Sequence, residues 1–274
     1  MEILRHDFDY DSFMEAPADP DRPALLMLDY DGTLAPFVQK RDEAVPYEGV
    51  RERVHEIAVT PGNRVVIISG RPTAEVQALL GLPESPIEYW GAHGWERLLP
   101  NGVTESYPLG NAEREHLTDA ALQATSAIGS DEDALEIKPT SVAVHWRGLP
   151  EEDARQRREM IEQIWRPLTA GAELELHTFD GGIELRAQGR NKGDAVRTLL
   201  SDAPPETVVA YLGDDQTDED AFQALRELPR FTHRACVLVR PELRDSAADL
   251  WLHPPDELLQ WLDRWMERTR HDGS

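Results

Sequence analysis

A short apolar run that ends in two aspartates limits what this chain can fold into more than any other feature. The run from Leu25 to Leu28 is followed by Asp29 and Asp31, and then by a Gly-Thr turn. Short apolar runs bounded by turn residues indicate buried strands of a parallel sheet. Because open parallel sheets bind ligands beyond the carboxyl ends of their strands, we expect both carboxylates at a functional edge. An ordinary strand that ends in an Asp-Gly turn is the alternative.

Length and composition narrow the class of protein. The 274 residues are enough for one large domain or two smaller ones, and no apolar run is long enough to span a membrane. The first residues lack the basic-then-apolar pattern of a signal peptide. The single cysteine, Cys236, lies in an apolar run and is expected in a buried strand. We therefore expect a cytoplasmic protein.

The net charge of the chain indicates which kinds of partner it can bind. A net charge of −24 disfavours nucleic acid and anionic membranes, since both bind basic surfaces. We expect a small-molecule substrate and a monomer. Only Lys40, Lys138 and Lys192 are lysines, and the other basic residues are arginines. Such a surface is typical of salt-adapted proteins, in which salt screens self-repulsion; a GC-rich genome, which also replaces lysine with arginine, is the alternative.

Alternating strands and helices predict a parallel sheet with helices on both faces. The expected strands cover residues 24–29, 64–68, 87–90, 207–212 and 236–239, and the expected helices cover 46–58, 72–81, 191–200, 218–228 and 255–268. Residues 1–23 are acidic and contain prolines, so we expect a loose leader there. A hairpin is expected over residues 98–103, around an Asn-Gly turn.

The pattern changes at about residue 109. Two helices are expected there, at 111–128 and 150–168, and each is followed by a strand pair, at 135–138 with 141–146 and at 173–177 with 182–186, the second around Asp180-Gly181. This order predicts a compact α+β unit. We therefore expect an α/β core formed by residues 1–108 and 187–274, interrupted by an inserted domain at 109–186.

Four of the predicted strands end in polar residues that suit phosphate chemistry. The residues at these strand ends are Asp29 with Asp31, Ser69 with Arg71, His93, and Asp214 with Asp215. If the strands are parallel neighbours, these side chains converge, and several carboxylates in one crevice need a cation. Oxygen ligands of this kind suit Mg²⁺, and a Mg²⁺ ion held in this way is typical of phosphoryl transfer.

Phosphate oxygens also need hydrogen-bond donors. Ser69 offers a hydroxyl group and Gly70 a backbone N–H, while Lys192 stands at a predicted helix start, where an anion is favoured. Each feature has an ordinary alternative: a turn at Ser69, an exposed lysine, and helix capping by the acids from Asp214 to Asp218. Their order along the chain favours a phosphoryl-transfer site.

This ordered set resembles the haloacid dehalogenase (HAD) superfamily of phosphatases. DYDGT occupies residues 29–33, Ser69 follows an apolar strand, Lys192 lies in NKG, and GDDQTDEDAF occupies 213–222. The resemblance implies an α/β fold: a Rossmann-like HAD core with a parallel sheet, plus an inserted α+β cap domain that governs substrate specificity.

The resemblance also implies a role for each matching residue. Asp29 would attack phosphorus and form an aspartyl-phosphate, and Asp31 would protonate the leaving oxygen and then deprotonate the attacking water. Mg²⁺ would bind the Asp29 carboxylate, the backbone carbonyl of Asp31, and Asp214. The remaining residues are implied to support these groups: Ser69 and Lys192 on the phosphoryl oxygens, and Asp215 and Asp218 around the metal ion.

Within the superfamily, the chain resembles the trehalose-6-phosphate phosphatases over roughly residues 24–265. LDYDGTLAPF, SGR, GAHGWE, the segment from Glu136 to Arg147 and YLGDDQTDEDAF carry this resemblance. It implies Mg²⁺-dependent hydrolysis of trehalose 6-phosphate to trehalose and phosphate, with the glucose hydroxyls bound by Glu136, Lys138 and Glu184. Further substrate contacts are expected from Thr33, Gly70, Arg71, His93 and Arg147.

Alternatives remain at the sugar end of the site. Period-2 spacing places Glu136 and Lys138 on one face of a strand, where charged groups can discriminate sugars, but an ordinary surface ion pair has the same pattern. His93 could equally be structural. A related phosphatase acting on glucosylglycerol phosphate, sucrose phosphate or mannosyl-phosphoglycerate is the second function, and a catalytically silent sugar-phosphate-binding module is the third. The chain also departs from the family at Ala187-Gln188-Gly189, where proline is common.

Overall fold

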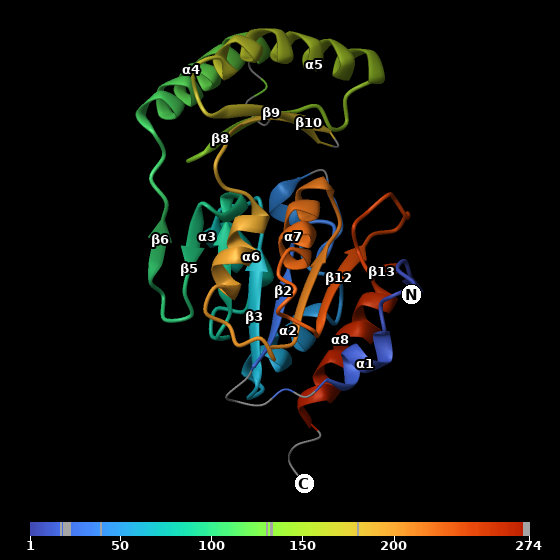
Figure 1. The fold of residues 1–274 in the computed structure, drawn as a ribbon. Helices are drawn as coiled ribbons and strands as arrows, with labels where there is room; N and C mark the ends of the chain where they lie inside the picture. The colour runs from blue at the N-terminus through green and yellow to red at the C-terminus, as the bar shows by residue number, and fades with distance from the viewer. Residues whose placement is uncertain are drawn as a thin grey trace. The chain divides into compact units, whose positions relative to one another are not determined.

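The structure is a computed structural model, and it describes residues 1–16, 18, 23–38, 40–129, 131, 134–179 and 181–270. The chain divides into two compact units (Figure 1). The core unit comprises Met1–Ser106 and Asn191–Ser274, and the inserted unit comprises Tyr107–Arg190. The guanidinium of Arg190 stacks on the ring of Tyr107 at 3.3 Å, which ties together the two ends of the inserted unit.

A nine-stranded sheet forms the centre of the core unit, in the order β1-β13-β12-β11-β2-β3-β4-β5-β6. Its strands are β1 (Glu2–Ile3), β2 (Ala24–Leu28), β3 (Asn63–Ile68), β4 (Glu88–Gly91), β5 (Glu96–Leu98), β6 (Thr104–Ser106), β11 (Val209–Gly213), β12 (Arg234–Val239) and β13 (Leu250–Leu252). The strands from β13 to β4 run parallel, whereas β1, β5 and β6 are antiparallel to their neighbours.

Helices cover both faces of this sheet (Figure 1). One face packs against α1 (Tyr10–Glu15), α2 (Val50–Val59), α3 (Thr73–Leu80) and α8 (Asp256–Arg270), and the other against α6 (Lys192–Leu200) and α7 (Gln216–Arg226). In β2, Leu26 and Leu28 face the first group of helices, and Leu25 and Met27 face away from it. Because both faces of the strand are buried, its sequence is a continuous apolar run rather than an alternation.

The expectation of a loose N-terminal leader is wrong for the described part of residues 1–23. Strand β1 extends the sheet by pairing with β13, and Phe13 and Met14 of α1 are buried. The ring of Phe13 lies 6.2 Å from that of Trp265, and Arg268 donates a hydrogen bond of 2.8 Å to the Phe13 carbonyl. Phe13 and Met14, two apolar residues in an acidic stretch, are thus buried where α1 packs near the C-terminal end of the chain. Residues 17 and 19–22 of the expected leader lie outside the described residues.

The inserted unit is a two-layer α+β structure with an antiparallel sheet in the order β7-β8-β10-β9. Its elements are α4 (Asn111–Ile128), β7 (Leu135–Lys138), β8 (Ser141–His145), α5 (Glu151–Trp165), β9 (Leu174–Phe179) and β10 (Gly182–Ala187). The helices pack on one face of the sheet (Figure 1), where Trp165 is fully buried and donates to the Ala120 carbonyl. Asp180, in the expected turn between β9 and β10, lies outside the described residues.

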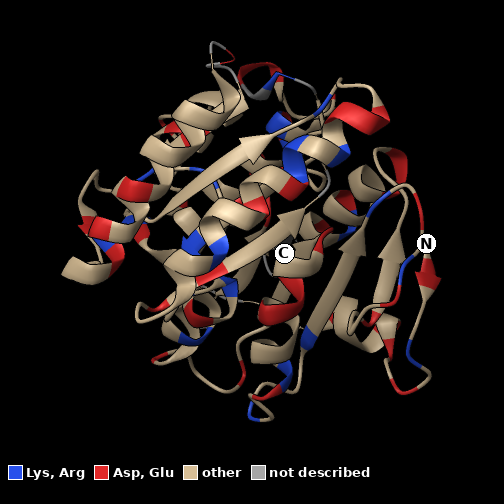
Figure 2. Ribbon diagram, turned by 90° about the horizontal axis from the view of Figure 1, so that it is seen from above, with Lys and Arg blue, Asp and Glu red and all other residues tan. Residues whose placement is uncertain are grey.

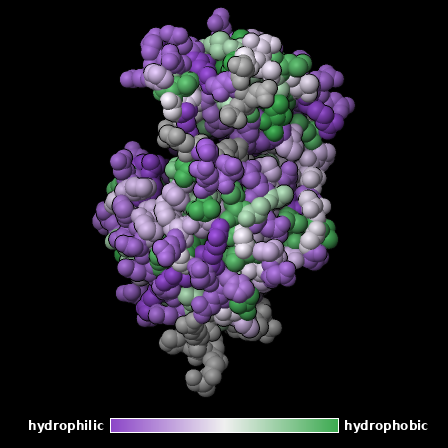
Figure 3. Space-filling model, turned by 180° about the vertical axis from the view of Figure 1, so that it is seen from behind, coloured by the Kyte–Doolittle hydropathy of each residue, from purple (hydrophilic) through white to green (hydrophobic). Residues whose placement is uncertain are grey.

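The surface carries intermixed charges. Figure 2 shows acidic and basic residues interspersed on the helices, and Figure 3 shows a mostly hydrophilic face with scattered hydrophobic residues. On α5, for example, Arg155 pairs with Glu152 and Glu159. Exposed pairs of this kind contribute about 0–1 kcal/mol each. Among the described residues, no helix combines the length and the apolar character needed to cross a membrane.

Candidate active site

The carboxyl ends of four adjacent parallel strands bring the predicted core residues to one edge of the sheet. Asp29 follows β2, Ser69 follows β3, His93 follows β4, and Asp214 follows β11. The backbone N–H of Asp29 donates to the Leu212 carbonyl at 2.8 Å, which extends the pairing of β2 with β11. The strand order β11-β2-β3-β4 therefore places these residues side by side, as the sequence predicted.

Lys192 joins this edge from the first turn of α6. Its ammonium donates to Asp29 Oδ1 and to Asp218 Oδ1, both at 2.7 Å, and the residue is only 3% exposed. Asn191 and Asp194 form a reciprocal capping box at the start of α6, which fixes the direction in which Lys192 leaves the helix. The alternative of an exposed surface lysine is therefore wrong.

Asp218 organises the loop that carries Asp214. Its Oδ1 accepts hydrogen bonds from Lys192 and from the hydroxyl of Tyr211 at 2.7 Å, and its Oδ2 accepts from the N–H groups of Asp214 and Asp215 at 2.9 and 3.0 Å. Both oxygens are thus used by protein donors. The helix-capping alternative holds as well, because Asp215 caps α7 and Asp218 completes that capping box.

The geometry around Asp214 suits a cation. One oxygen each from Asp29, Asp214 and Asp218 lies within 4.8 Å of the other two, and all three residues are buried. Asp214 Oδ1 is buried and has no hydrogen-bond partner among the described residues. A Cβ atom at Gly32, whose φ is +83°, would lie 2.3 Å from Asp214 Oδ2. Because Asp218 is already saturated with donors, Asp29 and Asp214 are the carboxylates that remain to bind a hard cation.

Burial controls the ionisation of this cluster. It raises the pKa of Asp29 and of Asp214 well above the ordinary range; neighbouring carboxylates add to the effect and Lys192 opposes it. Burial also works against the charge of Lys192, but Asp218 and Asp29 outweigh it and raise the pKa of the ammonium. A single ammonium among several buried carboxylates leaves the cluster short of positive charge, and a divalent cation would supply it.

The guanidinium of Arg71 pairs with Asp31, which follows β2. Its Nε and Nη2 donate to the two oxygens of Asp31 at 2.6 and 2.7 Å, and its Nη1 donates to Glu75. Such a bidentate pair fixes the plane of the Asp31 carboxylate. The expected contact between Arg71 and a substrate stays a prediction.

The loops after β3 and β4 lie against each other. The N–H of His93 donates to the Ser69 carbonyl at 3.0 Å, and a Cβ atom at Gly70 would lie 2.6 Å from the His93 ring. Ala92 and His93 have positive φ angles of 48° and 56°, a conformation that is uncommon outside glycine and concentrated at functional sites. Gly70 and His93, both predicted to bind substrate, therefore adjoin Ser69.

Several supporting residues had no place in the sequence-based prediction. Arg240 and Arg244 donate to the Asp214 carbonyl at 3.2 and 3.1 Å, and Arg244 also donates to the Asp215 carbonyl at 2.7 Å. No motif in the sequence links these arginines to Asp214, because they follow β12 and lie 26 and 30 residues further along the chain. Tyr211 carried a signal, since period-2 spacing places it on the same face of β11 as Gly213, beside Asp218. Thr33, predicted to bind substrate, donates to Asp29 Oδ2 at 3.3 Å.

The inserted unit holds a second polar cluster, formed by Glu136, Lys138, Ser141, His145 and Glu184. Lys138 lies between the two glutamates, 3.3 Å from Glu136 Oε1 and 3.0 Å from Glu184 Oε1. Ser141 donates to Glu184 at 2.6 Å, and His145 Nε2 lies 3.1 Å from Glu136 Oε2. The three residues predicted to bind a sugar thus lie together, with Ser141 and His145 as additions. Arg147, also predicted, lies against Gly181, where an added Cβ would meet Arg147 Cγ at 2.3 Å.

The fold is that of the HAD-like hydrolases. A haloacid dehalogenase-like hydrolase from Bacteroides thetaiotaomicron superposes with a TM-score of 0.61 at 18% identity, over 89% of this chain and 99% of that one. The C-terminal domain of a Candida albicans trehalose-6-phosphate phosphatase gives a TM-score of 0.77 at 23% identity, over 90% and 93% of the two chains. At these identities the likeness concerns the fold, and it confirms the predicted fold class.

The chain belongs to the trehalose-phosphatase family, whose model matches residues 27–249. A trehalose-phosphate phosphatase of Mycobacterium marinum is 34% identical over an alignment of 232 positions that covers 81% of this chain. The chain spans 57% of the length of that relative. The resemblance inferred from the motifs is therefore confirmed at the level of the family.

Proposed function

We propose that the chain is a Mg²⁺-dependent phosphatase that hydrolyses trehalose 6-phosphate to trehalose and phosphate. The observation that carries this proposal is the contact of Lys192 with Asp29, beside a buried oxygen of Asp214 that has no partner in the described part of the chain. These residues lie within the region matched by the family model. A buried carboxylate held by a fixed ammonium, next to a place for a cation, is an arrangement suited to phosphoryl transfer.

In the proposed reaction, Asp29 attacks phosphorus while the bond between phosphorus and the sugar oxygen breaks. Lys192 and Thr33, which donate to separate oxygens of Asp29, orient the attacking carboxylate. Mg²⁺, held by Asp29, Asp214 and the backbone carbonyl of Asp31, would supply positive charge that neutralises the phosphoryl oxygens. Ser69 and Lys192 would donate to the same oxygens, and Asp215 and Asp218 would support the metal site.

Asp31 is the general acid in the first half of the proposed reaction and the general base in the second. As an acid it gives its proton to the leaving sugar oxygen, and as a base it takes a proton from the water that then attacks the aspartyl-phosphate. Phosphate leaves and the Asp29 carboxylate is restored. Arg71 donates to both oxygens of Asp31, so one of these hydrogen bonds would open when that oxygen carries the proton, and the other would keep the carboxyl group in one orientation.

The inserted unit would act as the cap that selects the sugar. Glu136, Lys138 and Glu184 provide both acceptors and a donor for sugar hydroxyls on one face of the sheet. Gly70, His93 and Arg147 are further proposed substrate contacts. We also propose that the protein works as a cytoplasmic monomer without a nucleic-acid or membrane partner, which its net charge of −24 supports.

The proposal is tested by measuring phosphate release from a panel of sugar phosphates with and without Mg²⁺. Trehalose 6-phosphate should be hydrolysed fastest, and only with the metal. Asp29→Asn should abolish release, whereas Asp263→Asn, at a half-exposed site paired with Arg53, should not. Comparable rates on every sugar phosphate would refute the substrate, and an active Asp29→Asn variant would refute the mechanism.

The role of the polar cluster is tested separately. Lys138→Gln should lower turnover of trehalose 6-phosphate and spare p-nitrophenyl phosphate, which has no sugar to bind. Lys40→Gln is the matched control, because Lys40 is an exposed lysine whose ion pair among the described residues is with Glu43, three positions away. An equal loss on both substrates in Lys138→Gln would mean that the cluster does not select the sugar.

A further inference from the structure

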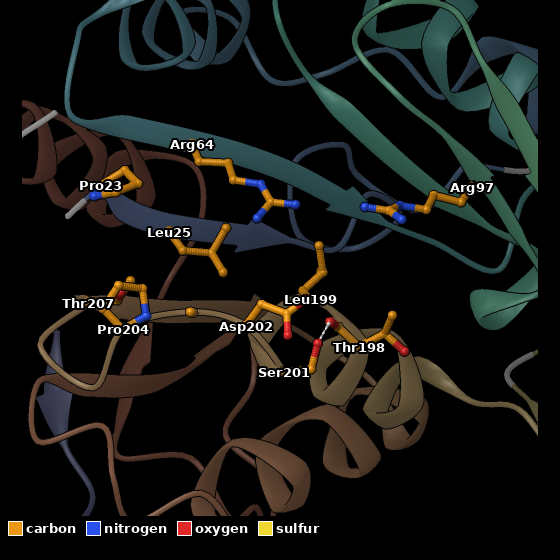
Figure 4. Close-up of a pocket in the computed structure, with 11 residues that line it drawn as sticks. Pro23, Leu25, Arg64, Arg97, Thr198, Leu199, Ser201, Asp202, Pro204 and Thr207 are labelled. Atoms are coloured by element: carbon orange, nitrogen blue, oxygen red, sulfur yellow. Dashed lines mark hydrogen bonds between the residues drawn. The ribbon is translucent and has the colours of Figure 1, made fainter. Parts of the chain in front are cut away.

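The core unit contains a cavity at the amino ends of its parallel strands, away from the edge that carries Asp29. Its volume is about 350 Å³, within the range of small-molecule sites. Residues that line it include Leu25 at the start of β2, Arg64 at the start of β3, Thr207 before β11, and Leu199 at the end of α6 (Figure 4). None of its lining residues belongs to the proposed active site.

Two arginines line one side of this cavity with spare donors. In Figure 4 the guanidinium groups of Arg64 and Arg97 point toward each other. Buried Glu88 accepts from Arg64 Nη2 at 2.6 Å and from Arg97 Nε at 2.7 Å, and Glu105 accepts from Arg97 Nη1 at 3.1 Å. These pairs hold both arginines in place. Arg64 Nε, Arg64 Nη1 and Arg97 Nη2 donate to no described residue, so they are available to a ligand.

Thr207 lines the same cavity and carries a buried hydroxyl. Thr207 is 2% exposed, and its Oγ1 has no hydrogen-bond partner among the described residues. A buried polar group left in this state carries a desolvation cost. When the side chain turns its hydroxyl toward the cavity, a ligand there can supply the partner and remove this cost. Thr207 therefore favours a ligand that can form hydrogen bonds.

The balance of charge and polarity indicates the class of ligand. The positive charges of Arg64 and Arg97 are matched by Glu88, Glu105 and the carboxylate of Asp202, which also lines the cavity. The walls therefore offer donors and acceptors without an excess of positive charge, which disfavours a phosphate.

Part of the lining is apolar. Leu25, Leu199 and Pro204 lie below the two guanidinium groups in Figure 4, and Pro23 also lines the cavity. Hydroxyl groups act as both donors and acceptors, and the C–H groups of a sugar ring can pack on such apolar side chains. A sugar therefore combines the two kinds of contact that the cavity offers.

We propose that this cavity is a second binding site, for a neutral polyhydroxylated sugar. The choice of trehalose as that sugar rests on the proposed function, whereas the class of ligand rests on the cavity alone. The site lies at the far end of α6, the helix whose first residue is Lys192, and at the start of β2, the strand that leads to Asp29.

Diffraction from crystals soaked in trehalose, and separately in inorganic phosphate, would locate the ligand. We expect trehalose, and not phosphate, in the cavity. Absence of the sugar from the cavity, or phosphate in its place, would overturn the proposal. The outcome does not depend on turnover, so it is separate from success or failure with trehalose 6-phosphate as a substrate.

Calorimetric titration with trehalose tests the role of the hydroxyl. Thr207→Val should weaken binding at the cavity about tenfold, the loss of roughly one hydrogen bond, while Thr207→Ser should retain binding. Thr118→Val, which removes a hydroxyl from the exposed face of α4, is the matched control. Both Thr207 variants should keep the rate on p-nitrophenyl phosphate. Unchanged affinity in Thr207→Val would refute the assignment.

Discussion

The substitution Asp218→Asn tests how much the buried cluster depends on one carboxylate. Asp218 is fully buried and accepts four hydrogen bonds, two on each oxygen. An asparagine of the same shape keeps one acceptor oxygen and replaces the other with an NH₂ donor. Whichever way the amide is turned, two hydrogen bonds are lost and the new donor faces other donors.

The magnitude follows from those contacts. Each lost hydrogen bond to a charged group costs about 1.5–3 kcal/mol, so two cost about 3–6 kcal/mol. Burial raises the pKa of Asp218, and Asp215 adds to that rise, so removal of the charge relieves some repulsion and offsets part of the loss. We therefore expect the free energy of unfolding of the core unit to fall by about 3 kcal/mol, against a total of about 5–15 kcal/mol for a typical domain.

Asp194→Asn is the matched control. Asp194 holds the same position in the capping box of α6 as Asp218 holds in that of α7, but its side chain is 35% exposed. Its Oδ2 accepts one hydrogen bond, from the N–H of Asn191 at 3.0 Å, and an asparagine oxygen can replace it. We expect a loss of less than about 1 kcal/mol.

The assay must report on the core unit, because a chain with two compact units need not unfold in one step. Hydrogen exchange of peptides from β11 and α7, measured by mass spectrometry over a urea series, gives the free energy of opening for this region. A loss of under about 1 kcal/mol in Asp218→Asn, no greater than that in Asp194→Asn, would refute the claim that the four hydrogen bonds organise the loop.

Three further changes test other parts of the core unit. Burial works against the ionisation of Glu88, but hydrogen bonds from two arginines hold its pKa below the ordinary value of 4.5. The ionised Glu88 side chain therefore stabilises the fold above pH 4.5, and this stabilisation is lost as the pH falls through the folded-state pKa. Unfolding midpoints between about pH 5 and 3 should therefore fall less steeply in Glu88→Gln than in the unchanged protein, and equal slopes would contradict this reasoning. Gly32→Ala should abolish hydrolysis of p-nitrophenyl phosphate, because the added Cβ would lie 2.3 Å from Asp214 Oδ2. Gly102 has a similar φ of +82° but open space around it, so Gly102→Ala should keep the rate and lower the free energy of unfolding by about 1 kcal/mol. Chelation should abolish the same hydrolysis and Mg²⁺ should restore it; full activity after exhaustive chelation would exclude the metal.

Local patterns were enough to predict most of the fold. Apolar runs that end in turn residues located β2, β3 and β11, and the Asn101-Gly102 turn located the hairpin between β5 and β6. Short or unusual elements escaped prediction. Strand β13 has three residues, and α1 lies in an acidic stretch whose apolar residues are buried through tertiary contacts, among them that of Phe13 with Trp265 of α8.

The sequence by itself determined which chemistry-bearing residues stand at strand ends, because parallel strands place their carboxyl ends at one edge of a sheet. Tertiary structure alone decided which charged group meets which partner. It placed Arg71 on Asp31, Arg244 on the loop of Asp214, and four donors on Asp218. Periodicity and turn chemistry are local and can be read along the chain, whereas side-chain pairing depends on how residues far apart in sequence pack together.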